Sequence, residues 1–230
     1  MDRLIALEPD QPFFPLNKAR FAFDEKADVK TVRAVYDEFA ASGKGDLEVT
    51  FWRIWFAMCG RDFVAAKKVL SECPNEELLF FGVLVPRGIA ALWLEFVEGN
   101  HPAADRFADA RAQLYRKVEA DRADPFLLQA LALTDVALGR TEESIQEGQR
   151  VLEMLPISVD AFDGPMLATN VAMVYVWAEQ RDSAFEQLNM IARLPNPRLT
   201  YGDLMTNPSW DPLRSDPRFE KLLAQLAPRE

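Results

Sequence analysis

Few residues of this chain belong to types that do chemistry on their own. The only histidine among the 230 residues is His101, placed by the pattern in a turn between helices with no carboxylate or cysteine at ligand spacing around it. A single histidine argues against most histidine-based metal sites. Because His101 is expected in a solvent-facing turn, we do not expect Ser-His-Asp chemistry either. Asp160 and Asp163 share a loop that lacks the distal glutamate of an EF-hand, so we expect them to cap helix starts. The sequence therefore predicts no metal, no cofactor and no enzymatic activity.

Cys59 and Cys73 bracket a predicted helix over residues 61–72. Such a helix is about 18 Å long at 1.5 Å per residue, whereas a disulfide needs Cα atoms within roughly 7 Å. We therefore expect these two cysteines not to pair with each other. Thiols that stay reduced suit a reducing compartment, which favours a cytoplasmic location. The periplasm is the alternative if the chain is joined to a transmembrane regulator.

The composition is that of an acidic globular protein. Apolar residues make up 49% and charged residues 27% of the chain, with 26 Lys and Arg against 36 Asp and Glu and a net charge of −10. A nucleic-acid-binding surface needs clustered basic residues, so the acidic balance argues against one. The most apolar window, residues 78–97, contains Pro86, Arg87 and Glu95. Charges there oppose membrane insertion and favour a buried run that ends at Pro86, followed by a helix over about 87–98.

A turn between helices recurs along the chain at an almost fixed interval. Apolar residues at three- and four-residue spacing predict successive helices. The turn falls at Gly60, Gly99, Gly139 and Glu179, at intervals of 39, 40 and 40 residues. Five residues after each comes a small residue, in order Ala65, Ala104, Ser144 and Ala184. Glycine can end the first helix with a positive φ, and a small side chain lets the two helices approach closely. An earlier pair, over 13–23 and 28–41, fits more loosely.

These turns resemble the tetratricopeptide repeat (TPR) family. The clearest copy, residues 125–156, matches that motif at Leu131, Ala132, Gly139, Ser144 and Pro156, and the next copy matches at Tyr175 and Ala184. The spacing alone also fits HEAT-type helix pairs, but the small residue after the glycine favours the TPR family. The resemblance implies an all-α, right-handed α-solenoid of about four to five helix pairs with a C-terminal capping helix. The interval of about 40 exceeds the family's 34 residues, which we attribute to longer second helices and loops.

Three regions follow from this organisation. Residues 1–12 are expected to be the tail of a preceding repeat or a leader. Leu4–Pro9 is typical of the end of a second helix, so we expect the chain to be a fragment of a longer protein. The alternative is a short solvated leader. Residues 13–195 carry the repeats, and residues 196–230 form the cap. In the cap, three Asx-Pro pairs predict short turns before a last helix over about 217–226. The apolar residues expected to cover the end of the stack are Trp210, Leu213, Phe219, Leu222 and Leu223.

Ligands of TPR proteins usually lie in a concave groove lined by the first helices. The family's groove positions correspond in this sequence to Ile54, Trp93, Leu133 and Met173. One helical turn earlier on the same face lie Ile89, Gln129 and Thr169, and Phe126 and Met166 are apolar neighbours. An apolar groove can accept an amphipathic helix or an extended peptide. The alternatives are that these residues are core or are covered by a neighbouring segment. No Lys or Asn occupies these positions, so a clamp for a C-terminal carboxylate is not expected. The aromatic run Phe51-Trp52-x-x-Trp55-Phe56 is interpreted as core, with one ring exposed for binding as the alternative.

A second, more specific resemblance concerns the C-terminal half. Its segments are Glu147-Gly148, Leu155–Ser158, Asp160–Pro165 and Trp210–Phe219. They are similar to the C-terminal repeat regions of large bacterial signalling proteins, which carry a kinase, nucleotide cyclase or winged-helix head. No head motif occurs here. The resemblance implies a non-catalytic protein–protein interaction scaffold, the regulatory C-terminal region of such a protein, whose partner is a protein or an apolar peptide, with no nucleic acid and no membrane insertion. The alternative is a sensor that binds a small molecule in a closed pocket around Trp93 and Phe126.

Overall fold

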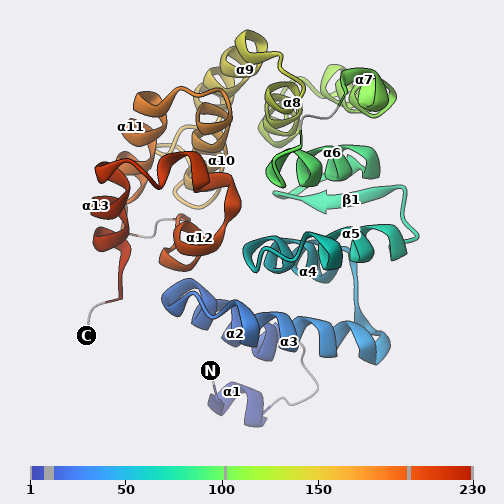
Figure 1. The fold of residues 1–230 in the computed structure, drawn as a ribbon, viewed down its shortest axis with the longest axis vertical. Helices are drawn as coiled ribbons and strands as arrows, with labels where there is room; N and C mark the ends of the chain where they lie inside the picture. The colour runs from blue at the N-terminus through green and yellow to red at the C-terminus, as the bar shows by residue number, and fades with distance from the viewer. Residues whose placement is uncertain (1, 8–12, 101–102, 196–197, 229–230) are drawn as a thin grey trace. The chain divides into compact units, whose positions relative to one another are not determined.

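The computed structural model describes residues 2–7, 13–100, 103–195 and 198–228, and these form helices and one short β-hairpin (Figure 1). The predicted all-α class is confirmed apart from that hairpin. The chain divides into two compact units, one of residues 1–73, 200–207 and 227–230 and one of residues 74–199 and 208–226. Within the described ranges, no helix combines the length and the apolar character that crossing a membrane requires.

The first unit is built from antiparallel helix pairs. Its helices are α1 (Asp2–Leu7), α2 (Phe13–Lys26), α3 (Val29–Phe39) with a π-helical extension (Ala40–Lys44), α4 (Leu47–Cys59), α5 (Phe63–Glu72) and α12 (Tyr201–Thr206). Helix α2 packs against α3, α3 against α4, and α4 against α5, while α12 packs against α2. The predicted pair over 13–23 and 28–41 is therefore present with slightly different ends. Cys59 and Cys73, at the ends of the α4–α5 pair, are not disulfide-bonded, as expected.

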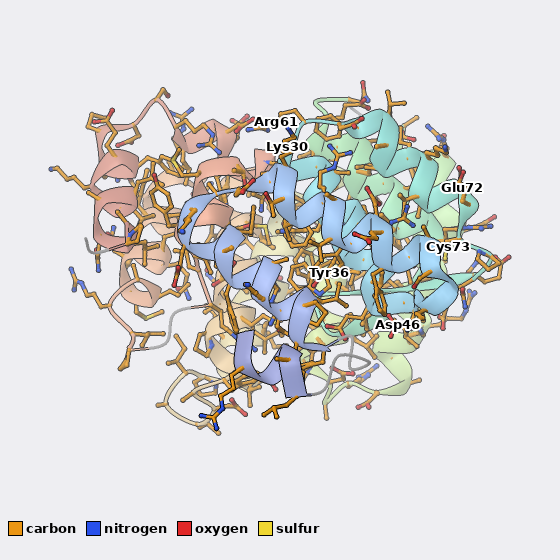
Figure 2. The ribbon with its side chains drawn as sticks, turned by 90° about the horizontal axis from the view of Figure 1, so that it is seen from below. Lys30, Tyr36, Asp46, Arg61, Glu72 and Cys73 are labelled. Atoms are coloured by element: carbon orange, nitrogen blue, oxygen red, sulfur yellow. The ribbon has the colours of Figure 1, made fainter. Side chains whose placement is uncertain are left out.

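Aromatic residues fill the core of the first unit. The ring of Phe56, which is fully buried, lies 5.0 Å from the ring of Phe23 and 5.3 Å from that of Tyr36. Figure 2 labels Tyr36 on α3. Trp52 stacks on Phe56 but stays half-buried, with the Arg20 guanidinium 5.1 Å from its ring. The interpretation as core is thus confirmed for Phe51, Trp55 and Phe56, which are buried, but not for Trp52.

The second unit stacks helix hairpins. It contains strands β1 (Glu77–Phe80) and β2 (Val83–Pro86), helices α6 (Arg87–Val97), α7 (Ala104–Ala120), α8 (Pro125–Ala137), α9 (Thr141–Met154), α10 (Asp163–Trp177) and α11 (Arg181–Ile191), a 3₁₀ helix (Pro208–Leu213) and α13 (Pro217–Leu226). From α6 to α11, each helix packs against the next one in the chain. In addition, α6 packs against α8 and α8 against α10, so the first helices of three consecutive hairpins contact one another. His101 lies outside the described residues.

The turns between paired helices follow the predicted positions but not always the predicted residue. Gly99 and Gly139 adopt φ values of 93° and 78°, as expected for glycine at a helix end. At the first copy Gly60 keeps a φ of −80°, and the next residue, Arg61, takes the positive φ of 60° instead. At the fourth copy Glu179 itself has a φ of 60°. A side chain in this left-handed region costs about 1–2 kcal/mol, so two of the four turns are strained.

The small residues after these turns are not all at helix contacts. Ser144 and Ala184 are buried, whereas Ala65 is only half-buried and Ala104 is exposed. The prediction of a close approach at Ala104 is therefore wrong. Between α6 and α7 the close approach falls elsewhere, because a Cβ on Gly88 would lie 2.7 Å from the Ala110 Cβ.

The β-hairpin of residues 77–86 was not predicted. Its strands pair antiparallel, with Phe80 opposite Val83, and Phe81 and Gly82 form a two-residue turn. The expected buried run over these residues does end at Pro86, and α6 does begin at Arg87. The sequence lacks the alternation of apolar and polar residues that predicts a strand, because the outward-facing Leu79 and Leu84 are also apolar.

In the C-terminal segment the predicted last helix is present, whereas α12 was not predicted. Helix α13 has the predicted ends and packs against α11, and the 3₁₀ helix packs against α10. Trp210, Leu213, Phe219 and Leu222 are buried and Leu223 is half-buried. The Arg218 guanidinium joins α13 to α11 through a 2.7 Å bond to Asp182 and also binds Asp216, which lowers the pKa of Asp216 to about 2. Asp160 lies in the turn before α10, where its Oδ1 accepts from the backbone N–H groups of Phe162 and Asp163. The N-cap position itself is Phe162, without a side-chain capping bond, and Asp163 is the first residue of the helix.

Candidate functional site

The predicted groove residues of the second unit lie on α6, α8 and α10, and most of them are buried. Exposed fractions are 4% for Trp93, 0% for Ile89, Gln129 and Leu133, 2% for Met173 and 7% for Thr169. Phe126 and Met166, each near the start of its helix, are half-buried. Ile54 lies on α4 in the first unit, where it is 1% exposed. Within the second unit, therefore, Phe126 and Met166 are the groove candidates with appreciable exposed surface.

The chain's own β-hairpin covers part of this set. The ring of Phe80 lies 5.5 Å from the Trp93 ring in an edge-to-face arrangement, and the ring of Phe81 lies 6.1 Å from it. A Cβ on Gly82 would lie 3.4 Å from Phe126 Cδ1 and 3.7 Å from Met166 Cε. Figure 1 shows β1 directly beside α6. The hairpin tip thus contacts candidate residues on all three first helices, and we call Trp93, Phe126 and Met166 the tip-binding surface.

Two buried donors on the helices that carry this surface, one on α6 and one on α8, have no hydrogen-bond acceptor. Neither Trp93 Nε1 nor Gln129 Nε2 has a partner among the residues that the structure describes. The oxygen of the same Gln129 amide does have one, because it accepts from Asn170 Nδ2 at 2.9 Å. A buried donor without an acceptor costs about 1–3 kcal/mol. With the hairpin in place, therefore, the first helices α6 and α8 each keep an unsatisfied N–H group.

The hairpin tip itself is strained. Phe81 has a φ of 48° and Gly82 a φ of 85°, the pattern of a type I′ turn. Such turns favour Asn-Gly or Asp-Gly, because their first residue must adopt a left-handed conformation that Asn and Asp tolerate. Phenylalanine at this position conflicts with the backbone that it must adopt.

A buried charge cluster joins α7, α8 and α9 of the same unit. The fully buried Asp135 carboxylate accepts two 2.5 Å bonds from Arg111 and lies 3.4 Å from the Arg140 guanidinium. Burial, together with the negative charge of Asp135, raises the pKa of Glu147 to about 8, although Arg111 and Arg140 act in the opposite direction. Glu147 Oε2 is buried and has no hydrogen-bond partner within the described part of the chain. The sequence named Glu147 only as part of a resemblance and gave no sign of this cluster.

A cavity of about 780 Å³ lies along α11, with Tyr175 of α10 at its edge. Its lining mixes polar and apolar side chains, namely Tyr175, Ser183, Glu186, Gln187, Asn189, Met190 and Arg193. None of the predicted groove residues lines it. In the described ranges no group of His, Cys, Asp and Glu side chains is arranged to hold a metal ion.

Comparisons with protein-family models, with curated proteins and with solved structures give no match. The interpretation of the site therefore depends on the residues and contacts of this chain.

Proposed function

We propose that the chain is a non-catalytic protein-interaction module of the TPR type, a right-handed solenoid of helix hairpins, and that it acts as the regulatory region of a larger bacterial signalling protein. One observation carries the proposal. The first helices of consecutive hairpins, α6, α8 and α10, pack against one another and share a surface to which a peptide segment, the hairpin tip, is already bound. Helices stacked in this way form the binding surfaces of repeat proteins.

The chemistry of that surface favours an apolar peptide as the partner. Trp93, Phe126 and Met166 offer two rings and a flexible thioether, and Met is common at surfaces that adapt to different partners. The alternative, a small-molecule sensor, would need its ligand to take the place of the hairpin tip beside Trp93 and Phe126. The net charge of −10 disfavours nucleic acid.

Site-specific photo-crosslinking tests the interaction. A photoreactive phenylalanine replaces Met166 in the full chain, and the control carries the same group at Tyr115, which is 44% exposed on α7. In cells that express the chain, position 166 should give a discrete adduct whose cross-linked peptide is apolar, and position 115 should not. The same products from both positions, or none from either, would contradict the proposal.

The regulatory role is tested separately by the reading frame of the gene upstream of residue 1. A kinase, cyclase or winged-helix segment in the same frame would support it. A stop codon and ribosome-binding site just upstream would instead indicate a free-standing adaptor.

A further inference from the structure

The hairpin tip is a place where local sequence preference and structure disagree. Phe81 occupies the first position of a type I′ turn at a φ of 48°, where Asn or Asp fits better. Its ring makes a tertiary contact instead, 6.1 Å from the ring of Trp93. Phe81 is therefore unfavourable for the turn but favourable for the contact with Trp93. We conclude that the contact, and not the turn, explains why phenylalanine occupies this position.

The tip is an incomplete ligand for the surface that it covers. Its rings pack on Trp93, yet Trp93 Nε1 and Gln129 Nε2 both find no acceptor in the described residues. A peptide that placed main-chain carbonyl oxygens at these two donors would satisfy them. Such a peptide would gain interactions that the hairpin does not make.

We infer that the tip, Phe81-Gly82, is an internal ligand of the tip-binding surface, and that the external ligand is a peptide with an aromatic side chain that displaces it. The aromatic ring takes the place of Phe81 on Trp93, and neighbouring main-chain carbonyls accept from Trp93 Nε1 and Gln129 Nε2. This inference rests on the proposed function. An internal ligand competes at a high effective concentration, so the tip sets a threshold of affinity that a partner must exceed.

The base of the hairpin is held in place, so displacement is confined to the tip. Lys117 Nζ of α7 donates to Glu77 Oε1 at 2.5 Å and to the Leu84 carbonyl at 2.8 Å. The Arg87 N–H donates to the Glu76 carbonyl at 2.8 Å, and β2 continues into α6 without a linker. Residues 78–83 lie between these anchors, and residues 80–83 around the tip are the segment that must move.

A competition experiment on the full chain tests the inference. The probe is a fluorescein-labelled synthetic peptide with the sequence of residues 76–87, and binding is followed by fluorescence anisotropy. The F81N variant keeps a favourable turn and removes the internal ring. If the tip covers the surface for more than nine-tenths of the time, F81N should bind the probe at least about tenfold more tightly than the unmodified chain. The control variant L84T changes an outward-facing side chain and should bind like the unmodified chain.

The position of the bound probe is checked by two further readouts. The Trp93 indole N–H resonance, assigned with W93F, should move downfield when the probe binds to F81N, and the same peptide carrying F81N should not bind. In the unmodified chain, the amides of residues 80–83 should exchange faster at saturating probe while those of α6 do not change.

Equal affinities of F81N and the unmodified chain would overturn the inference, as would probe binding that leaves the Trp93 resonance unmoved or no binding at all. If F81N does not fold, F81L provides the same comparison with a smaller expected gain. Cross-linking from position 166 together with equal affinities would leave the proposed function standing and refute only the role of the tip.

Discussion

Replacing Glu147 by Gln should change how the stability of the second unit depends on pH. The pKa of the Glu147 carboxyl is raised from an ordinary value of 4.5 to about 8, mainly by burial and to a smaller extent by the negative charge of Asp135. Below about pH 4.5 it is protonated in both the folded and the unfolded chain. Between pH 4.5 and 8 the folded chain keeps a proton that the unfolded chain has released, so the free energy of unfolding should fall as the pH rises and level off above about 8. The glutamine side chain is neutral throughout and should abolish this decline.

The size of the effect follows from the shift. At about 1.4 kcal/mol per pKa unit, a change from 4.5 to about 8 sets an upper bound of roughly 5 kcal/mol. Partial exposure and relaxation of the buried carboxylate reduce it, and we expect about 2 kcal/mol. E147Q should therefore be more stable than the unmodified chain by about 2 kcal/mol at pH 8.5 and about equal at pH 4.5. Urea unfolding at several pH values, followed by circular dichroism, measures the difference.

A matched control is Glu143 on the same helix, whose carboxylate is half-exposed and paired with Arg140 at 2.8 Å. E143Q should keep the decline between pH 5 and 8, because it leaves the buried Glu147 carboxyl in place. The reasoning is refuted if the unmodified chain shows no decline in this range, or if E147Q shows the same decline as the unmodified chain.

Other substitutions test the backbone and the packing. G139A should destabilise the chain by about 1 kcal/mol, since Gly139 has a φ of 78° and no atom lies within 4 Å of the new Cβ. E179G should stabilise it by up to about 1 kcal/mol, because Glu179 has a φ of 60°; urea unfolding of both variants measures this pair, and equal signs would contradict the strain argument. G202A places a Cβ 2.0 Å from the Phe23 carbonyl oxygen and should cost the first unit about 2 kcal/mol or more. Faster hydrogen exchange in α2 would report that loss, and unchanged protection would contradict the contact of α12 with α2.

Features that depend on nearby residues could be predicted from the sequence. Asp216-Pro217 marked the start of α13, and Pro86 marked the boundary before α6, because capping bonds and proline geometry act within a few residues. The glycine turns were found for the same reason, and the prediction failed only at Arg61, where the positive φ passed to the residue after Gly60. Apolar spacing placed Trp93 and Leu133 on the buried faces of their helices.

The segment that covers Trp93 could be identified only from the tertiary structure. The sequence named Trp93, Phe126 and Met166 as groove candidates, but the hairpin that contacts them has apolar residues on both faces and so lacked the alternation typical of a strand. The Arg111–Asp135 pair joins residues 24 positions apart on different helices. No short-range pattern encodes such a pair, because its geometry exists only after the helices have packed. The helices and their ends were therefore local properties of this chain, whereas the contacts of the hairpin with Trp93, Phe126 and Met166 and the buried charges arose from contacts between distant segments.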